Sequence, residues 1–154
     1  MLVVGTRRGS ARARRDPQNG GAAVEFALIM PLFMAIVFGV IDYGWYFYQR
    51  YALAAAVRDG IRAGSLVMST ATPDSWTTAQ TRAIAVLTQS STINPASVTW
   101  GPASGSRYST VGTTPAVNVL TFSGQYTFVP LIGIVPLPSH PMNYSMTMAL
   151  ELQN

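Results

Sequence analysis

A long apolar run occupies the first third of the chain. From Gly21 to Ile41 the sequence has 21 residues, of which Glu25 alone is charged. A helix rises about 1.5 Å per residue, so this run spans about 31 Å, the thickness of a bilayer core. Aromatic residues of the kind that gather at membrane–water interfaces follow directly: Tyr43, Trp45, Tyr46, Tyr48 and Tyr51. The pattern predicts a transmembrane helix over residues 21–42.

The helical pattern continues beyond the aromatic residues. The next segment is rich in alanine and lacks proline, so we expect one helix from about Ala22 to about Leu66. Its external part, 43–66, contains Gly60 and Gly64, and glycine weakens a helix. The sequence therefore predicts a helix with one half in the membrane and the other half outside it.

A second, shorter helix is predicted over Ser75–Gln89. Asp74 or Ser75 can cap its first turn. Its apolar residues recur at helical spacing, at Ala79, Ala83, Ile84 and Leu87. The dipeptide Asn94-Pro95 then indicates a turn.

Three later segments have strand-like patterns. Apolar and polar residues alternate over Met142–Leu152, the best strand signal in the chain. Val117–Val129 is rich in Thr, Val, Phe and Tyr, and Gly124 near its middle predicts a bulge or a bend. Ser97–Trp100 is a candidate short strand. Residues 101–115 are rich in Gly, Ser, Thr and Pro, so we expect an exposed loop there.

These elements predict an α+β fold. The long N-terminal helix would pack on a small extracytoplasmic domain, 67–154, with a short helix and an antiparallel sheet of three or four strands. An apolar loop over 129–138, with three prolines, joins the last two strands and is too short to span a bilayer. We expect the core to combine the apolar face of the last strand with Val117, Val119, Phe122, Tyr126 and Phe128.

The charge of the chain is concentrated at its start. The net charge is +4, and residues 1–20 hold five arginines and one acid, whereas residues 21–154 hold five of each. The first segment has no apolar periodicity and is interpreted as a cytoplasmic leader, in agreement with the positive-inside rule. No basic surface is left in the remainder, so the composition gives no support to nucleic-acid binding.

The sequence contains no pattern of catalytic or metal-binding residues. There is no cysteine, which excludes disulfides and thiol chemistry. His140 is the single histidine, no cluster of further ligands accompanies it, and we expect a structural or surface role. The acids are scattered singly, and no glycine-rich phosphate loop is present. We therefore expect no enzymatic activity, no metal and no cofactor.

The acid inside the apolar run calls for a physical explanation. An ionisable residue in a membrane segment is costly and is a functional candidate by default. If the leader were removed between Gly20 and Gly21, the new amine at Gly21 would lie one helical turn from the carboxylate of Glu25. The same acid could neutralise the amine of a neighbouring subunit when helices bundle. The alternative is an uncleaved signal anchor with an acid near the cytoplasmic face.

The sequence around this acid resembles a known family. Gly20-Gly21-Ala22-Ala23-Val24-Glu25-Phe26-Ala27-Leu28-Ile29-Met30-Pro31-Leu32 is similar to the N-terminal signature of TadE-like proteins, which are minor pilins, or pseudopilins, of tight-adherence (Tad, Flp-type) pilus systems. The resemblance continues through Phe38–Gly44. It includes Ala54–Gly64, where Asp59 replaces the family's commoner glutamate. The segment that resembles the family covers roughly residues 14–66.

This resemblance implies a pilin-like fold and a role for each residue of the motif. A prepilin peptidase would cut after Gly20, so that Gly21 becomes the mature N-terminus. Glu25 and Phe26 match the acid–aromatic pair of the processing motif. A cut after Gly21 is the alternative, and it would place Glu25 fourth in the mature chain.

Further residues of the long helix are candidates for structure or assembly. Pro31 removes a helical hydrogen bond and is expected to kink the membrane segment. The polar residues beyond it are interpreted as a solvated face with weak ion pairs or, alternatively, as contacts to a partner pilin. Together with Glu25, the candidate assembly contacts are Asp42, Arg58, Asp59 and Arg62.

The resemblance and the pattern together predict a minor pilin-like subunit. It would assemble or anchor a Tad-type adhesive pilus as a single-pass protein of the bacterial inner membrane, with its N-terminus inside and its domain outside. Expected partners are the prepilin peptidase, major and other minor pilins, the inner-membrane assembly platform and membrane lipid. One alternative is a signal-anchored extracytoplasmic binding module that does not polymerise. Another is a secreted enzyme cut at the small-residue pattern Ala52-Leu53-Ala54.

Overall fold

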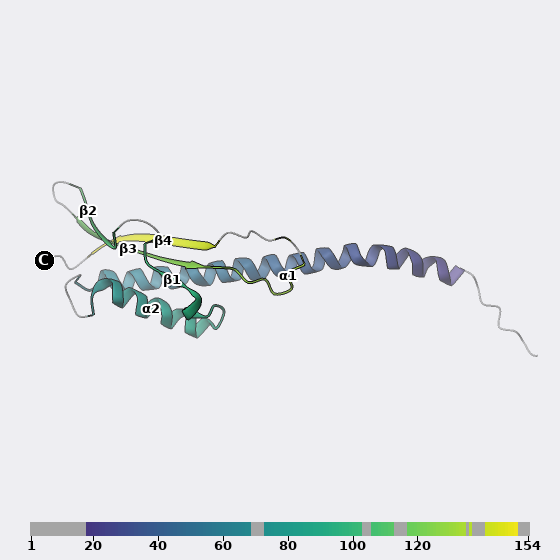
Figure 1. Cartoon of the computed structure of the whole chain (residues 1–154), viewed down its shortest axis with the longest axis horizontal. Helices are drawn as coiled ribbons and strands as arrows, with labels where there is room; N and C mark the ends of the chain where they lie inside the picture. The colour runs from purple at the N-terminus through teal and green to yellow at the C-terminus, as the bar shows by residue number, and fades with distance from the viewer. Residues whose placement is uncertain are drawn as a thin grey trace, which may run out of the picture. The chain divides into compact units, whose positions relative to one another are not determined.

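A computed structural model describes residues 18–68, 73–102, 106–112, 117–134, 136 and 141–150. The chain divides into two compact units, the first ending at Val37 and the second beginning at Phe38. Helix α1 (Gln18–Ser65) contributes to both units (Figure 1). The expectation of one long N-terminal helix is confirmed.

The first unit is helical and has no core of its own among its described residues. Its large apolar side chains are exposed, with Leu28 82% accessible and Leu32 66% accessible. The other exposed large apolar residues of this unit are Val24, Phe26, Ile29, Phe33 and Ile36. Leucine, isoleucine and phenylalanine are among the residues most often buried in water-soluble proteins, so this surface suits an apolar environment.

The second unit contains a four-stranded antiparallel sheet built around one central strand, β3 (Val117–Tyr126). Strand β4 (Met142–Ala149) pairs along β3 from Val119 to Tyr126. Two shorter strands pair with β3 at separate places: β1 (Thr99–Trp100) and β2 (Tyr108–Val111). Part of β3 pairs with both β2 and β4, and another part pairs with both β1 and β4. A strand has two edges, so β1 and β2 lie along one edge of β3 and β4 lies along the other.

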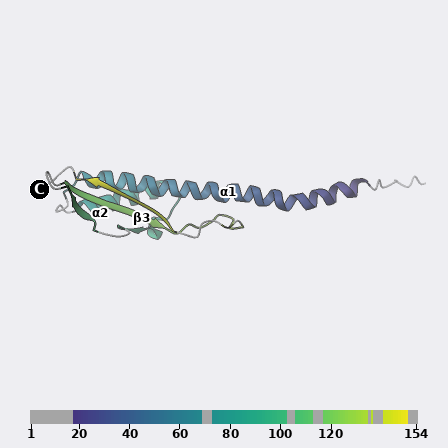
Figure 2. The same ribbon diagram turned by 90° about the horizontal axis from the view of Figure 1, so that it is seen from above.

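Helix α2 (Ser75–Ser90) and the C-terminal part of α1 pack on one face of this sheet, as Figures 1 and 2 show. Asp74 caps α2, and its carboxylate accepts a hydrogen bond from the backbone N–H of Thr77 at 2.9 Å. A 3₁₀ turn, η1 (Pro95–Ser97), follows with Asn94 as its cap. The second helix, its cap and the turn at Asn94-Pro95 are all as predicted.

Two glycines allow α1, α2 and β3 to approach one another closely. A Cβ atom on Gly60 would lie 2.6 Å from the carbonyl oxygen of Ala79. One on Gly64 would lie 2.5 Å from the carbonyl oxygen of Ser75 and 2.9 Å from Leu120. Glycine weakens an isolated helix, but at these positions it permits the packing on which the domain depends.

The core lies between the two helices and the inner face of the sheet. Phe122 is fully buried there and stacks on Trp100, with ring centroids 5.4 Å apart. Half-buried Phe128 contacts Tyr46 of α1 edge to face. The fully buried aliphatic residues of this core include Leu53, Val57, Ile61, Leu87 and Leu120.

The structure corrects four expectations. Tyr108–Val111 is a strand, although the segment was expected to be loop. Gly124 lies in regular register with Tyr144, so the predicted bulge is wrong, and its Cβ position would be 3.0 Å from Leu53. Val117 and Val119 were expected in the core with Phe122, but alternate residues of a strand face opposite sides, so both lie on the other face of the sheet. There Val119 is buried and Val117 is half-buried. Strand β3 ends at Tyr126, three residues earlier than expected.

Candidate functional site

The predicted processing motif lies near the start of α1. Gly20, Gly21, Glu25 and Phe26 are all helical and exposed. Gly21 and Glu25 are four residues apart, which places them on the same side of the helix, one turn from each other. Their arrangement agrees with an amine at residue 21 close to the carboxylate, while cleavage itself stays a prediction.

Pro31 also lies within α1 and is exposed. Its ring cannot donate a backbone hydrogen bond to the preceding turn. In a membrane helix, a neighbouring helix can satisfy the carbonyl group that is left free. The kink expected at this residue stays a prediction.

Asp42 has a role that the sequence did not reveal. Its side chain is completely buried, so its interpretation as part of a solvated polar face is wrong. The carboxylate accepts two backbone hydrogen bonds, one from Ile132 at 2.9 Å and one from Gly133 at 3.0 Å. Gly133 has a φ of +75°, a conformation that glycine adopts without strain. Asp42 thus clamps the apolar loop after β3 to helix α1.

The three other polar candidates on α1 are exposed. The guanidinium of Arg58 donates a hydrogen bond from Nε to the hydroxyl of Tyr144 at 3.0 Å and lies 5.7 Å from the centre of its ring. This contact joins α1 to strand β4. Asp59 and Arg62 line a shallow depression beside Arg82 of α2. Their exposure keeps them available for a partner, and that role stays a prediction.

A polar cluster that sequence reasoning missed joins the start of α2 to β2. The hydroxyl of Tyr108 donates to the Asp74 carboxylate at 2.8 Å and accepts from the backbone N–H of Trp76 at 3.1 Å. The guanidinium of Arg107 lies 3.7 Å from the centre of the Trp76 ring. Since these residues are about 30 positions apart, no local pattern could have indicated the cluster.

The cluster shifts two pKa values in opposite directions. Hydrogen bonds from Thr77 and Tyr108 lower the pKa of Asp74, with a smaller contribution from the charge of Arg107. Burial is the largest influence on Tyr108 and raises the pKa of its hydroxyl, and the neighbouring Asp74 raises it further. At neutral pH the carboxylate is therefore charged and the phenol is protonated, as their hydrogen bond requires.

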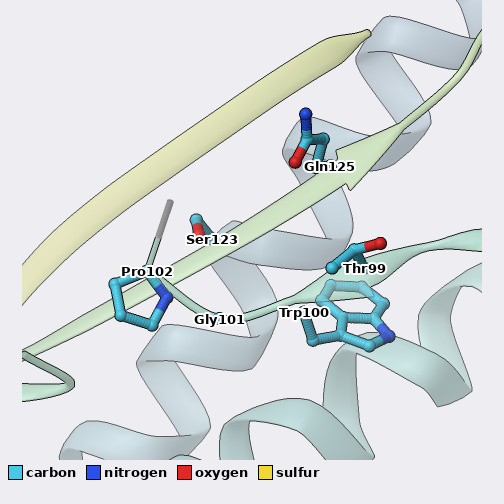
Figure 3. Close-up of a pocket in the computed structure, with 6 residues that line it drawn as sticks. All are labelled: Thr99, Trp100, Gly101, Pro102, Ser123 and Gln125. Atoms are coloured by element: carbon cyan, nitrogen blue, oxygen red, sulfur yellow. The ribbon is translucent and has the colours of Figure 1, made fainter. Parts of the chain in front are cut away.

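The pocket drawn in Figure 3 offers no acid–base chemistry. It lies at the edge of the sheet where β1 and β3 pair, and Ser123 and Gln125 come from β3. Its other lining residues are Thr99, Trp100, Gly101 and Pro102. None of the six carries a carboxylate, an imidazole or an amine that could act as a general acid or base. We interpret it as a surface feature of the sheet edge.

Two further predictions concern metals and signal cleavage. Within the described ranges, no three His, Asp or Glu side chains are close enough to hold a metal ion, and His140 lies outside those ranges. Ala52 and Leu53, part of the small-residue cleavage pattern, are buried in the core. Cleavage after Ala54 would cut α1 and remove Leu53 from the core of the domain, which argues against a secreted enzyme with an ordinary signal peptide.

The described part of the chain has one helix that could cross a membrane. By length and composition this is α1 from Gly20 onward, whose most apolar window has a mean hydropathy of 2.4 and is 0% buried within the protein. The fold therefore combines a candidate membrane anchor with a small α+β domain. A family model for TadE-like proteins matches residues 20–62, which confirms the resemblance over this segment. No curated protein and no solved structure matches the chain.

Proposed function

We propose that this protein is a pilin-like subunit that takes part in the assembly or anchoring of a Tad-type adhesive pilus. The match to TadE-like proteins over residues 20–62 supports an association with such a pilus. The observation that carries the finer role is Glu25, an exposed acid on an apolar helix whose surface is unoccupied within its own unit. A structural role, and not a catalytic one, follows from this proposal.

The acid has a physical purpose if helices of several subunits bundle. A charged side chain costs about 2.5–3.5 kcal/mol at the centre of a membrane helix on insertion scales, and Glu25, near the cytoplasmic end of the span, carries part of this cost. A terminal ammonium at Gly21, produced by a prepilin peptidase, would offset this cost from the same chain or from a neighbour. The exposed side chains around Glu25 would then contact the helices of other pilins or the surrounding lipid.

The proposed location follows from the charges at the start of the chain. The arginines of residues 1–20 would hold that segment in the cytoplasm, and the domain over 67–154 would lie outside the inner membrane. A reporter fused after Asn154 should be active outside the cytoplasm. Activity restricted to the cytoplasm would contradict this topology.

Processing can be tested by N-terminal sequencing of the protein from cells that contain the pilus machinery. The mature chain should begin at Gly21, and Gly20→Arg should leave the leader attached. Ser10→Arg is the matched control, because it adds the same charge farther from the cut and should be processed normally. An intact leader on the wild-type protein would contradict the proposal.

The role of Glu25 separates assembly from simple anchoring. Glu25→Ala should insert into the membrane at least as well as the wild type, because it removes a charge from lipid, but it should fail to crosslink to partner pilins and to support adhesion. Glu25→Asp, which keeps the charge, should retain part of both. Normal crosslinking and adhesion by Glu25→Ala would favour an anchored binding module that does not polymerise.

A further inference from the structure

The apolar loop after β3 presents an aliphatic surface that the domain leaves uncovered. Four of its large aliphatic side chains are exposed: Val129, Leu131, Ile132 and Ile134. Leu131 is the most accessible of them, at 63%. The segment 127–134 contains no charged residue. Single exposed apolar residues are normal on a protein surface, whereas a contiguous group of them indicates an interaction site.

The loop is attached to α1 at two points. The buried carboxylate of Asp42 accepts hydrogen bonds from the backbone N–H groups of Ile132 and Gly133. At the start of the loop, Phe128 packs against Tyr46, with ring centroids 5.3 Å apart. Figure 1 shows the yellow-green segment after β3 running beside α1. Hydrogen bonds to a charged acceptor are stronger than neutral ones, so this attachment sets the loop's position along the helix.

That position coincides with the end of the apolar run. Asp42 is the first charged residue after Gly21–Ile41, a run long enough to cross a bilayer core once. A loop hydrogen-bonded to Asp42 therefore lies at the depth where the helix leaves the membrane. The exposed aromatic residues of α1 near this level are Tyr43, Phe47 and Tyr48, and aromatic residues are enriched at that boundary.

We propose that residues 127–134 form a second membrane contact, in which Leu131 and its aliphatic neighbours enter the outer leaflet beside the helix. This inference rests on the proposed function, because it requires α1 to span the membrane. Backbone N–H groups without hydrogen-bond partners are costly in lipid. In this loop the carboxylate of Asp42 accepts hydrogen bonds from two backbone N–H groups, and Pro130 has no backbone N–H group. The loop would hold the domain against the membrane surface until the subunit enters a fibre.

The chemistry of the loop favours lipid over a protein partner. Hot spots of protein interfaces are enriched in Trp, Tyr and Arg. The exposed large side chains of the loop are valine, leucine and isoleucine, and the other exposed residues of 127–134 are Thr127, Pro130 and Gly133, so the segment has neither a charge nor an amide side chain. Such side chains gain free energy from contact with acyl chains in proportion to the area that leaves water.

The absence of cysteine from the chain allows a direct test by single labelling. The full chain, with Leu131→Cys carrying an environment-sensitive fluorophore, is reconstituted into vesicles of phosphatidylethanolamine and phosphatidylglycerol. Quenching is measured with nitroxide lipids labelled at a shallow or a deep acyl position, and with iodide in the water. Ile36→Cys, exposed on the apolar part of α1, is the membrane reference. Ser109→Cys, exposed on β2, is the aqueous reference.

Shallow lipid nitroxides should quench the label at Leu131 several-fold more than the label at Ser109, and iodide should show the reverse order. Deep nitroxides should quench the label at Ile36. Lipid quenching at Ile36 without quenching at Leu131 would overturn the loop contact and leave the membrane anchor intact. Protection of Leu131 from iodide without lipid quenching would mean that protein covers the loop, which also overturns the proposal. No lipid quenching at Ile36 would overturn the anchor and the loop contact together.

The clamp is tested by adding Asp42→Asn to each labelled chain. An amide has one acceptor oxygen where the carboxylate has two, so one of the two backbone N–H groups loses its partner. Lipid quenching at Leu131 should fall several-fold while quenching at Ile36 is unchanged. Unchanged quenching at Leu131 would contradict the clamp. The measurement on Leu131→Cys with Asp42 intact does not depend on this variant.

Discussion

The two stretches of helix α1 share one secondary structure and have opposite surroundings. Over 20–37 the helix exposes large apolar side chains such as Leu32, whereas from Ala52 to Ser65 it buries Leu53 and uses alanine and glycine to approach other elements. Large apolar residues without a partner in their own chain suit lipid or other helices. Small residues at helical spacing instead indicate close packing within the domain.

Two of the three acids of this helix, Glu25 and Asp42, repeat the same contrast. Glu25 is exposed on the apolar stretch, and Asp42 is buried with two backbone N–H groups bound to its oxygens. Each is a single charge in an apolar sequence. Asp42 therefore has its partner inside the chain, and we propose that Glu25 finds its partner at a terminal amine.

Truncation of a leucine should distinguish the two stretches most strongly. Leu53→Ala removes a side chain that is 1% exposed and should lower the free energy of unfolding of the domain by about 2–5 kcal/mol. Leu32→Ala, on the same helix, removes an exposed side chain and should leave that free energy nearly unchanged. Urea unfolding of the full chain in mild detergent, followed by tryptophan fluorescence, measures both. Equal losses of unfolding free energy in the two variants would contradict the difference between the packed and the exposed stretch of α1.

Glycine substitutions give the next largest difference. Gly64→Ala places a methyl group 2.5 Å from the carbonyl oxygen of Ser75 and should destabilise the domain by about 1–3 kcal/mol. Gly44→Ala meets nothing within 4 Å and should be neutral or stabilise the helix by up to about 1 kcal/mol. The comparison uses the same unfolding measurement. A stable Gly64→Ala domain would mean that the helices do not approach as closely as described.

The cap of α2 provides a pH-dependent test within the packed region. Asp74→Ala should cost about 1 kcal/mol at pH 7, because the helix loses its N-cap. The pKa of Asp74 is lowered in the folded state, so its charged form stabilises the fold above the ordinary carboxyl range and this contribution disappears as the pH falls through the lowered value. The difference between wild type and variant should therefore shrink on acidification. Asp59→Ala, at an exposed acid of α1, is the control.

The exposed contact between α1 and β4 should have the smallest effect. Tyr144→Phe removes the hydrogen bond from Arg58 and keeps the ring beneath the guanidinium. Because the contact is exposed to water, the loss should be below about 1 kcal/mol. A larger loss in urea unfolding would show that this contact is part of the packed region and not of its surface.

Much of the fold could be predicted because its signals are local. The apolar run, the cap at Asp74 and the alternation after Met142 each act through neighbouring residues, and all three elements are present in the structure. The motif around Glu25 was also recognisable, since it is a contiguous segment within the matched residues 20–62. The spacing of apolar residues along a segment shows which of its side chains face the core or lipid and which face water.

Other features depend on residues that meet only after folding. Strand β2 has four residues and no apolar alternation, and it is a strand because it pairs with the start of β3. Gly64 is a weak helix former by propensity, but a close-packing residue once α2 lies against it. Asp42 receives its hydrogen bonds from a loop 90 positions away. Propensity and spacing carry no information about such distant partners, so tertiary packing alone decides these roles.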